Sequence, residues 1–162
     1  MKSILLTPRL AMYLKLMEYY GLKEVPGEKN NPQILQFFAE IGHKWVQSDE
    51  TDWCAATINW IALQCDCQRS GKLDARSWMS VGRETKYPQL GDIVVFWTGS
   101  LTGSWHGHTG LFVKKDGNYI YTFGGNQSAI IGNKSYNMIC IKPYPEVSKT
   151  FGLLGYRSVD YI

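Results

Sequence analysis

The chain has 162 residues, of which 44% are hydrophobic and 19% charged, a balance typical of a globular protein rather than a disordered one. Its formal net charge of +3 is too small to indicate a nucleic-acid partner, so we expect none. No stretch reaches the roughly 18–20 apolar residues of a transmembrane helix, so we expect no stable membrane insertion. The length fits a single domain, 1–162, whose core needs no disulfide.

Three helices are predicted in the first half of the chain. Thr7-Pro8 is a capping hydroxyl followed by proline, and apolar residues at helical spacing continue from there to residue 21. Asn31-Pro32 repeats this start signal and predicts a second short helix ending near residue 42. A third helix is expected over about 53–66, where the apolar stripe indicates a central, buried position. A further helical turn is expected over 75–81.

The second half of the chain has the pattern of strands. Apolar or alternating runs occur at 93–97, 108–114, 119–123, 138–142 and 154–157. Asp116-Gly117 between two of these runs predicts a hairpin. Helices followed by antiparallel strands predict an α+β fold, with the N-terminal helices packed on a C-terminal antiparallel sheet.

Cys54 is the most informative residue, because it stands where a polar loop turns into the third helix. Backbone N–H groups at a helix start lower the pKa of a thiol, which favours a nucleophilic thiolate. His108 opens a predicted strand between two glycines and is our choice of general base, with His106 as the alternative. Asn126, in a Gly-rich turn, is the candidate that orients the imidazole, with Gln127 as the alternative.

Each of these residues also has a structural explanation when taken alone: an inert core thiol, a structural histidine, a turn asparagine. Their order along the chain favours a catalytic site. Asp52 is interpreted as a helix cap that could also contact a substrate amine. Substrate contacts are further expected from aromatic and polar neighbours of the site, namely Trp53, Trp78, Trp105, His106 and Gln127. The Cys65-x-Cys67 pair has no partner pair at zinc spacing, so we expect no metal and no cofactor.

Several segments together resemble the NlpC-like and CHAP cysteine peptidases and amidases of bacteria and phages. They are 21–27, Asn31-Pro32, 52–56, 75–78, 91–96, 107–110 and 124–127. The resemblance implies a papain-like fold with the nucleophile at the N-terminus of the central helix. It also implies cleavage of amide bonds in peptidoglycan, with Cys54 as nucleophile, His108 as base and Asn126 as third residue. Typical NlpC-like members have Asp-Cys-Ser where this chain has Trp53-Cys54-Ala55. Many CHAP members have a glutamate two residues before the asparagine, where this chain has Gly124.

The sequence therefore predicts a cysteine hydrolase acting on peptidoglycan stem peptides, as an endopeptidase or an amidase. The alternatives are an inactive cell-wall-binding module with the same fold and an amide hydrolase acting on a non-wall substrate. Residues 1–9 lack a signal-peptide core and cleavage site. We expect synthesis in the bacterial cytoplasm and action in the periplasm or cell wall after release or secretion. Whether an immunity or delivery protein binds the chain is left open.

Overall fold

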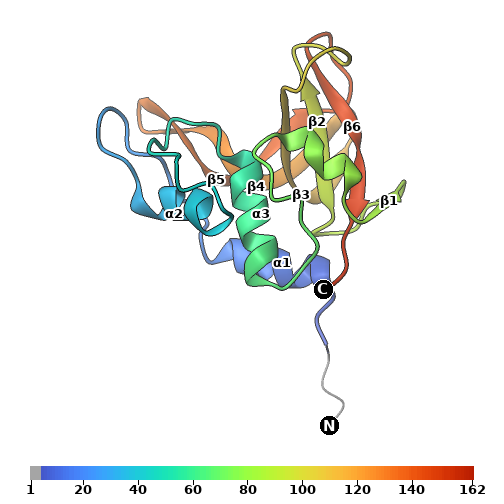
Figure 1. The fold of residues 1–162 in the computed structure, drawn as a ribbon. Helices are drawn as coiled ribbons and strands as arrows, with labels where there is room; N and C mark the ends of the chain where they lie inside the picture. Colours follow the sequence, from blue (N-terminus) through green and yellow to red (C-terminus); the bar gives the residue numbers. More distant parts are fainter. Residues whose placement is uncertain (1–4) are drawn as a thin grey trace.

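A computed structural model describes residues 5–162; residues 1–4, which belong to the segment assessed for an export signal, lie outside the described part. Helices come first along the chain and strands follow (Figure 1). The helical elements are α1 (Pro8–Met17), α2 (Pro32–Glu40), α3 (Cys54–Gln64) and the 3-10 helix η1 (Ala75–Ser80). The strands are β1 (Arg83–Thr85), β2 (Ile93–Thr98), β3 (Gly107–Asp116), β4 (Tyr119–Ile131), β5 (Lys134–Pro145) and β6 (Phe151–Ser158).

The strands form one six-stranded antiparallel sheet in the order β1-β6-β2-β3-β4-β5. The predicted α+β class is therefore confirmed. Strands β4 and β5 extend well beyond their predicted ranges and form a long hairpin beside the loop that follows α1 (Figure 1). Backbone hydrogen bonds join this loop to β5, from Gly21 N–H to Ile139 O and from Ile139 N–H to Leu22 O.

Helix α3 lies at the centre of the molecule, between the other helices and the sheet (Figure 1). Every residue from Cys54 to Ala62 is buried, which explains why the segment is apolar or small on all sides. Helices α1 and α2 pack on one side of α3, while β3 and β4 pack on the other. The start of α3, at its upper end in Figure 1, points into the angle between the sheet and the segment that connects α2 to α3.

Helix starts follow the predicted signals only in part. The Asn31 side chain accepts a hydrogen bond from Gln33 N–H and caps α2 as expected. Thr7 makes no side-chain cap on α1, and the first turn of α3 has no side-chain cap either, so the cap predicted for Asp52 is wrong. The acidic segment before α3 is used differently, because buried Asp49 accepts hydrogen bonds from Val25 N–H and Asn31 N–H at 2.9 and 2.7 Å.

The two faces of the sheet bury separate apolar clusters. The helix-facing cluster includes Ile93, Val95, Leu111 and Phe123 together with the helices. The opposite face carries the alternate residues of the same strands in a cluster formed by Val94, Phe96, Phe112, Ile120 and Tyr156. Burial on both faces makes these strands continuous apolar runs, which is the pattern seen in the sequence at 93–97.

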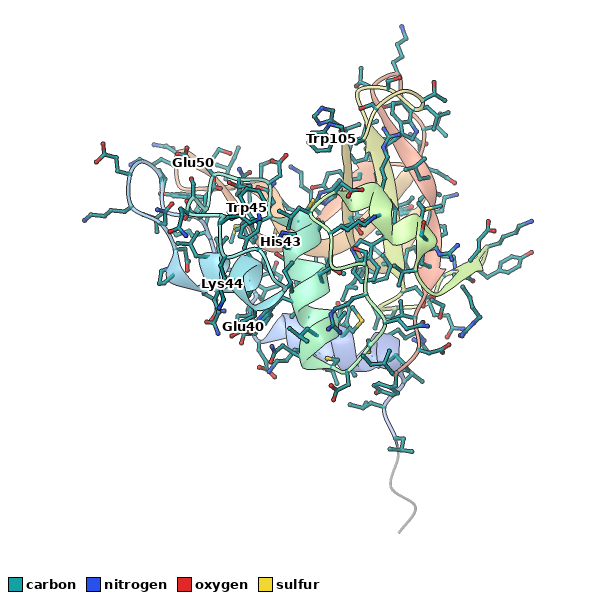
Figure 2. All side chains as sticks on the ribbon, in the orientation of Figure 1. Glu40, His43, Lys44, Trp45, Glu50 and Trp105 are labelled. Atoms are coloured by element: carbon teal, nitrogen blue, oxygen red, sulfur yellow. The ribbon has the colours of Figure 1, made fainter. Side chains whose placement is uncertain are left out.

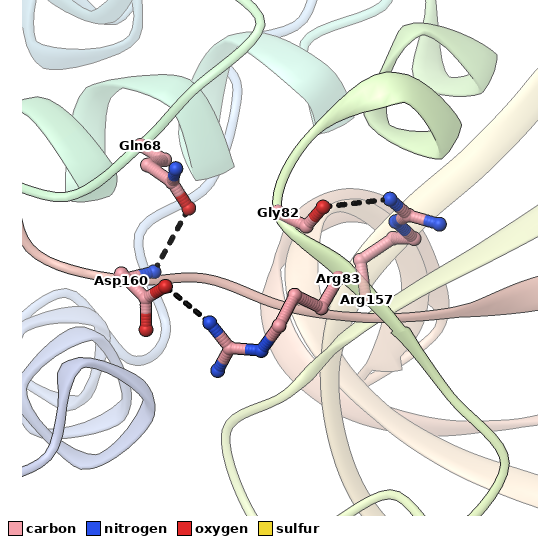
Figure 3. Close-up of polar contacts among 5 residues, drawn as sticks. All are labelled: Gln68, Gly82, Arg83, Arg157 and Asp160. Carbon is pink, nitrogen blue, oxygen red and sulfur yellow. Dashed lines mark hydrogen bonds and ion pairs between the residues drawn. The ribbon is translucent and has the colours of Figure 1, made fainter.

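The connections around α3 are fixed by polar contacts. After α2, His43 (labelled in Figure 2) has its Nε2 atom 2.8 Å from Gly71 O, and this contact joins the two loops that flank α3. At the other end of the molecule, Asp160 N–H donates to Gln68 Oε1 at 3.0 Å and the Asp160 carboxylate pairs with Arg83 (Figure 3). Within residues 5–162, none of the helices has the length and apolar character that a bilayer crossing requires.

Candidate active site

Cys54 is the first residue of α3, and its side chain is almost fully buried, with 5% exposed. Three backbone N–H groups lie near enough to its sulfur to lower the pKa of the thiol: those of Thr109, Ala55 and Cys54 itself. Those of Ala55 and Cys54 belong to the start of the helix, where N–H groups lack partners within the helix. That of Thr109 belongs to β3, directly after His108. The sulfur therefore lies against the part of β3 that carries the predicted base.

Strands β3 and β4 are not paired where the start of α3 packs against them. Pairing between β3 and β4 begins at Leu111 and Phe123, so the first residues of β3 lie outside this ladder and Thr109 N–H can face α3. Gly125 of β4 lies so close to α3 that a Cβ there would come within 2.4 Å of Thr57 Oγ1 and 2.7 Å of the Trp53 ring. The absence of a side chain at Gly125 thus allows β4 to pack on the first turn of α3.

His108 is buried, with 7% exposed, and its ring packs near Phe96 and Tyr144. The three rings form one cluster, with centroid distances of 6.3 Å from His108 to Phe96, 4.8 Å from His108 to Tyr144 and 5.5 Å from Phe96 to Tyr144. Its Nε2 atom lies 2.9 Å from Gln127 Oε1. The imidazole is therefore held by packing in this aromatic cluster and by one hydrogen bond to Gln127.

Gln127 is fully buried, and its amide has a single orientation that satisfies its neighbours. The Nε2 atom donates to two main-chain carbonyls, Thr122 O at 3.0 Å and Cys140 O at 2.6 Å. With both amide hydrogens used in this way, Oε1 must face His108 as an acceptor. We therefore assign a proton to His108 Nε2, which leaves Nδ1 with a free lone pair in the neutral ring.

A bulge in β4 brings Gln127, and not Asn126, to the imidazole. Between Gly124 and Gln127 the pairing with β5 shifts by one residue, and Asn126 adopts a left-handed conformation with φ of 55°. The Asn126 side chain turns outward and its Nδ2 lies 3.3 Å from Asp52 Oδ1. Asn126, the residue expected to orient the imidazole, is thus replaced in this position by the predicted alternative, Gln127.

Burial favours the neutral forms of both reactive groups. It raises the pKa of the Cys54 thiol to about 11, although the backbone N–H groups of Thr109, Ala55 and Cys54 act in the opposite direction. It lowers the pKa of the His108 imidazole to about 4, against the raising effect of its hydrogen bond to Gln127. The expectation that the helix start lowers the thiol pKa is therefore outweighed by desolvation.

The remaining predicted contacts divide by exposure. Trp53 and Trp78 are fully buried core residues, so the substrate contacts predicted for them are wrong. Trp105 is 61% exposed, and its ring stacks on that of His106 at 3.9 Å between centroids. His106 lies on the exposed loop before β3, whereas His108 lies inside the sheet beside the segment that contacts Cys54. Asp52 is exposed, and its carboxylate is close enough to act electrostatically on both Cys54 and His108.

A cleft of about 460 Å³ adjoins the site at Asp52. Its mostly apolar walls come from three separate loops, represented by His43 and Trp45, by Lys72 and Asp74, and by Trp105. Figure 2 labels His43, Trp45 and Trp105. Neither Trp45 nor His43 was among the predicted site residues. Their position next to the site depends on how the loop after α2 folds over α3, for which the sequence has no local signal.

The comparison with protein families bears on this same region. A family model for the CHAP domain matches residues 46–126, which is half of the chain and includes Cys54 and His108. The chain belongs to the CHAP domain family. CHAP domains are generally amidase or peptidase hydrolases, and membership indicates peptidoglycan hydrolysis and a peptidoglycan substrate in general terms. No curated protein and no solved structure matches the chain. Gln127 lies one residue beyond the matched CHAP segment.

Proposed function

We propose that this CHAP domain is a cysteine hydrolase with a papain-like arrangement that cleaves an amide bond in peptidoglycan. Cys54 is the nucleophile, His108 the general base and Gln127 the residue that orients the base. One observation carries the assignment: the Gln127 amide, held by two main-chain carbonyls, keeps the proton of His108 on Nε2. This leaves Nδ1 as the basic atom of an imidazole on the strand that also contacts the Cys54 sulfur.

The reaction starts from a neutral pair. As the Cys54 sulfur attacks the amide carbonyl, its proton passes to His108 Nδ1, and the resulting imidazolium is stabilised by the hydrogen bond from Nε2–H to Gln127 Oε1. The same Nδ1–H then protonates the leaving amine, which releases it and leaves a thioester on Cys54. Water hydrolyses the thioester with His108 again as base, which frees the carboxylate product and the thiol.

The start of α3 supplies stabilisation for the negative charge on the substrate oxygen. The Cys54 N–H group is at the helix start, where it has no carbonyl partner within the helix. An oxyanion that forms on the carbonyl attacked by Cys54 can accept a hydrogen bond from this group. The helix dipole points its positive end in the same direction. The buried position of Cys54 excludes water, which strengthens these interactions.

The test is release of soluble fragments from purified peptidoglycan by the wild-type protein and by Cys54→Ala and His108→Ala. We expect both variants to lose activity. Cys65→Ala is the matched control, because it removes a thiol outside the proposed pair, and it should remain active. Unchanged release by Cys54→Ala or His108→Ala refutes the mechanism. Wall binding without any cleavage by the wild type would instead identify an inactive wall-binding module.

Mass spectrometry of the same digests identifies the bond. An amidase separates the glycan from the whole stem peptide, whereas an endopeptidase leaves part of the peptide on the sugar. We further propose that residues 1–162 act as one domain, and that the protein acts in the periplasm or cell wall. Fractionation of producing cells, with activity measured in each fraction, tests this location.

A further inference from the structure

Two exposed tryptophans line the cleft beside Asp52. Trp45 is 70% exposed and Trp105 is 61% exposed, and both contribute to the same mostly apolar cleft (Figure 2). They lie on loops far apart in sequence, one before α3 and one before β3. Large aromatic rings that are exposed to solvent contribute less to stability than rings buried in the core. Two such rings in one cleft therefore indicate a surface that binds a ligand.

Both indoles are held in place by contacts behind them. Trp45 packs edge-on against the His43 ring, whose Nε2 is bonded to Gly71 O at 2.8 Å. Trp105 stacks on His106, and the loop that carries both is attached to η1 by Arg76. The guanidinium of Arg76 donates to three carbonyls of this loop, His106 O at 2.7 Å, Leu101 O at 2.8 Å and Ser100 O at 2.6 Å. The cleft walls are thus organised before a ligand binds.

The polar groups of the cleft have both signs of charge. Asp52 and Asp74 supply carboxylates and Lys72 supplies an ammonium group. An apolar surface of flat rings with a few polar groups of both signs suits a neutral pyranose, whose C–H face packs on indoles and whose hydroxyl and amide groups hydrogen-bond to the charged groups. A cationic ligand group would meet Lys72 in the same cleft.

We propose that the cleft binds the sugar ring of the peptidoglycan strand that carries the stem peptide. This inference rests on the proposed function and specifies its substrate. The cleft is lined by Asp52, two residues before Cys54, so the bond that this inference assigns to the thiol is the lactyl–peptide amide next to the bound sugar. The cut is then the amidase cut between glycan and peptide, and the sugar ring is part of what the protein recognises.

The test uses the Cys54→Ala protein, which binds without cleaving, and two defined probes. One is N-acetylmuramoyl-L-alanyl-D-isoglutamine, and the other is N-acetyl-L-alanyl-D-isoglutamine, which lacks the sugar. Calorimetric titration should show about tenfold tighter binding of the sugar-bearing probe. Trp45→Ala and Trp105→Ala in the same background should each weaken binding of that probe by about three- to tenfold and leave the sugar-free probe unaffected. Tyr87→Ala, which removes another exposed aromatic ring outside the cleft, is the control.

The inference is overturned if the two probes bind equally, if the sugar-bearing probe does not bind, or if the tryptophan variants weaken both probes alike. Tighter binding of the same dipeptide with a free amine would assign the cleft to an ammonium group and also overturn it. These outcomes are separate from a failure of the proposed function. Loss of sugar preference with intact cleavage of cell wall by the wild type removes only the inference. Sugar-selective binding without wild-type cleavage removes the enzymatic function and leaves a glycan-binding cleft.

Discussion

Replacing Gln127 by alanine should lower the rate of amide cleavage while leaving substrate binding nearly unchanged. The lost contact is the 2.9 Å hydrogen bond between His108 Nε2 and Gln127 Oε1, in a site from which solvent is excluded. A hydrogen bond to a group that becomes charged contributes about 1.5–3 kcal/mol, which corresponds to a loss of about 10- to 150-fold in kcat. KM should stay within about threefold, because the amide faces the imidazole and not the substrate.

Asn126→Gly is the matched control for this variant. Glycine adopts the left-handed φ of 55° at position 126 without strain, so the bulge is kept while the neighbouring amide is removed. Only the 3.3 Å contact to Asp52 is lost, and kcat should fall by less than about threefold. Rates are measured on purified peptidoglycan below the melting temperatures of both variants, since Gln127→Ala also leaves two carbonyls unpaired. A large loss for Asn126→Gly with normal kcat for Gln127→Ala would refute the assignment.

Three further outcomes are expected. Between the ordinary imidazole pKa of 6.5 and the value of about 4 for His108, the unfolded chain binds a proton that the folded chain does not. As the pH drops from 7 to 4, the free energy of unfolding should therefore fall by roughly 3 kcal/mol more in the wild type than in His108→Asn. Urea titrations at each pH measure this difference, and an equal fall in both proteins would contradict it. Burial raises the pKa of Cys54 to about 11, so the rate of alkylation of this thiol by iodoacetamide should rise about tenfold per pH unit above pH 7. A rate that levels off near neutral pH would contradict a neutral Cys54 thiol in the free protein. Gly125→Ala places a Cβ within 2.4 Å of Thr57 Oγ1 and 2.7 Å of Trp53, so thermal unfolding should show a loss of about 1–3 kcal/mol, and an unchanged melting temperature would mean that β4 can move away from α3 at little cost.

The helices could be predicted because their signals are local. Apolar spacing and a proline start were enough to locate α1 and α2, and the all-round apolar pattern of α3 indicated its central place. Strand β1 could not be found in this way, since Arg83–Thr85 is short and polar and is ordered by pairing with β6. The lengths of β4 and β5 were missed because the polar residues of their hairpin carry no core-facing pattern.

The candidate site shows the same limit at the level of single residues. Strict alternation along β4 directs Asn126 to the face that carries His108, and one extra residue in the bulge gives that place to Gln127. The two glycines before Asn126 were a signal that the strand is irregular there. Trp53 and Trp78 were predicted as substrate contacts, but both are fully buried, because neither sequence adjacency to Cys54 nor aromatic character reveals which way a side chain points.

The position of β6 within the sheet has a consequence for the order in which the protein is assembled. This last strand lies between β1 and β2, and β2 in turn is the neighbour of the strand that carries His108. Until residues 151–158 have left the ribosome, β2 lacks one of its two partners and its outer edge is open. A nascent chain is therefore expected to lack the complete sheet until synthesis reaches this strand. Shortening the protein from its C-terminal side removes an interior strand of the sheet instead of trimming its border.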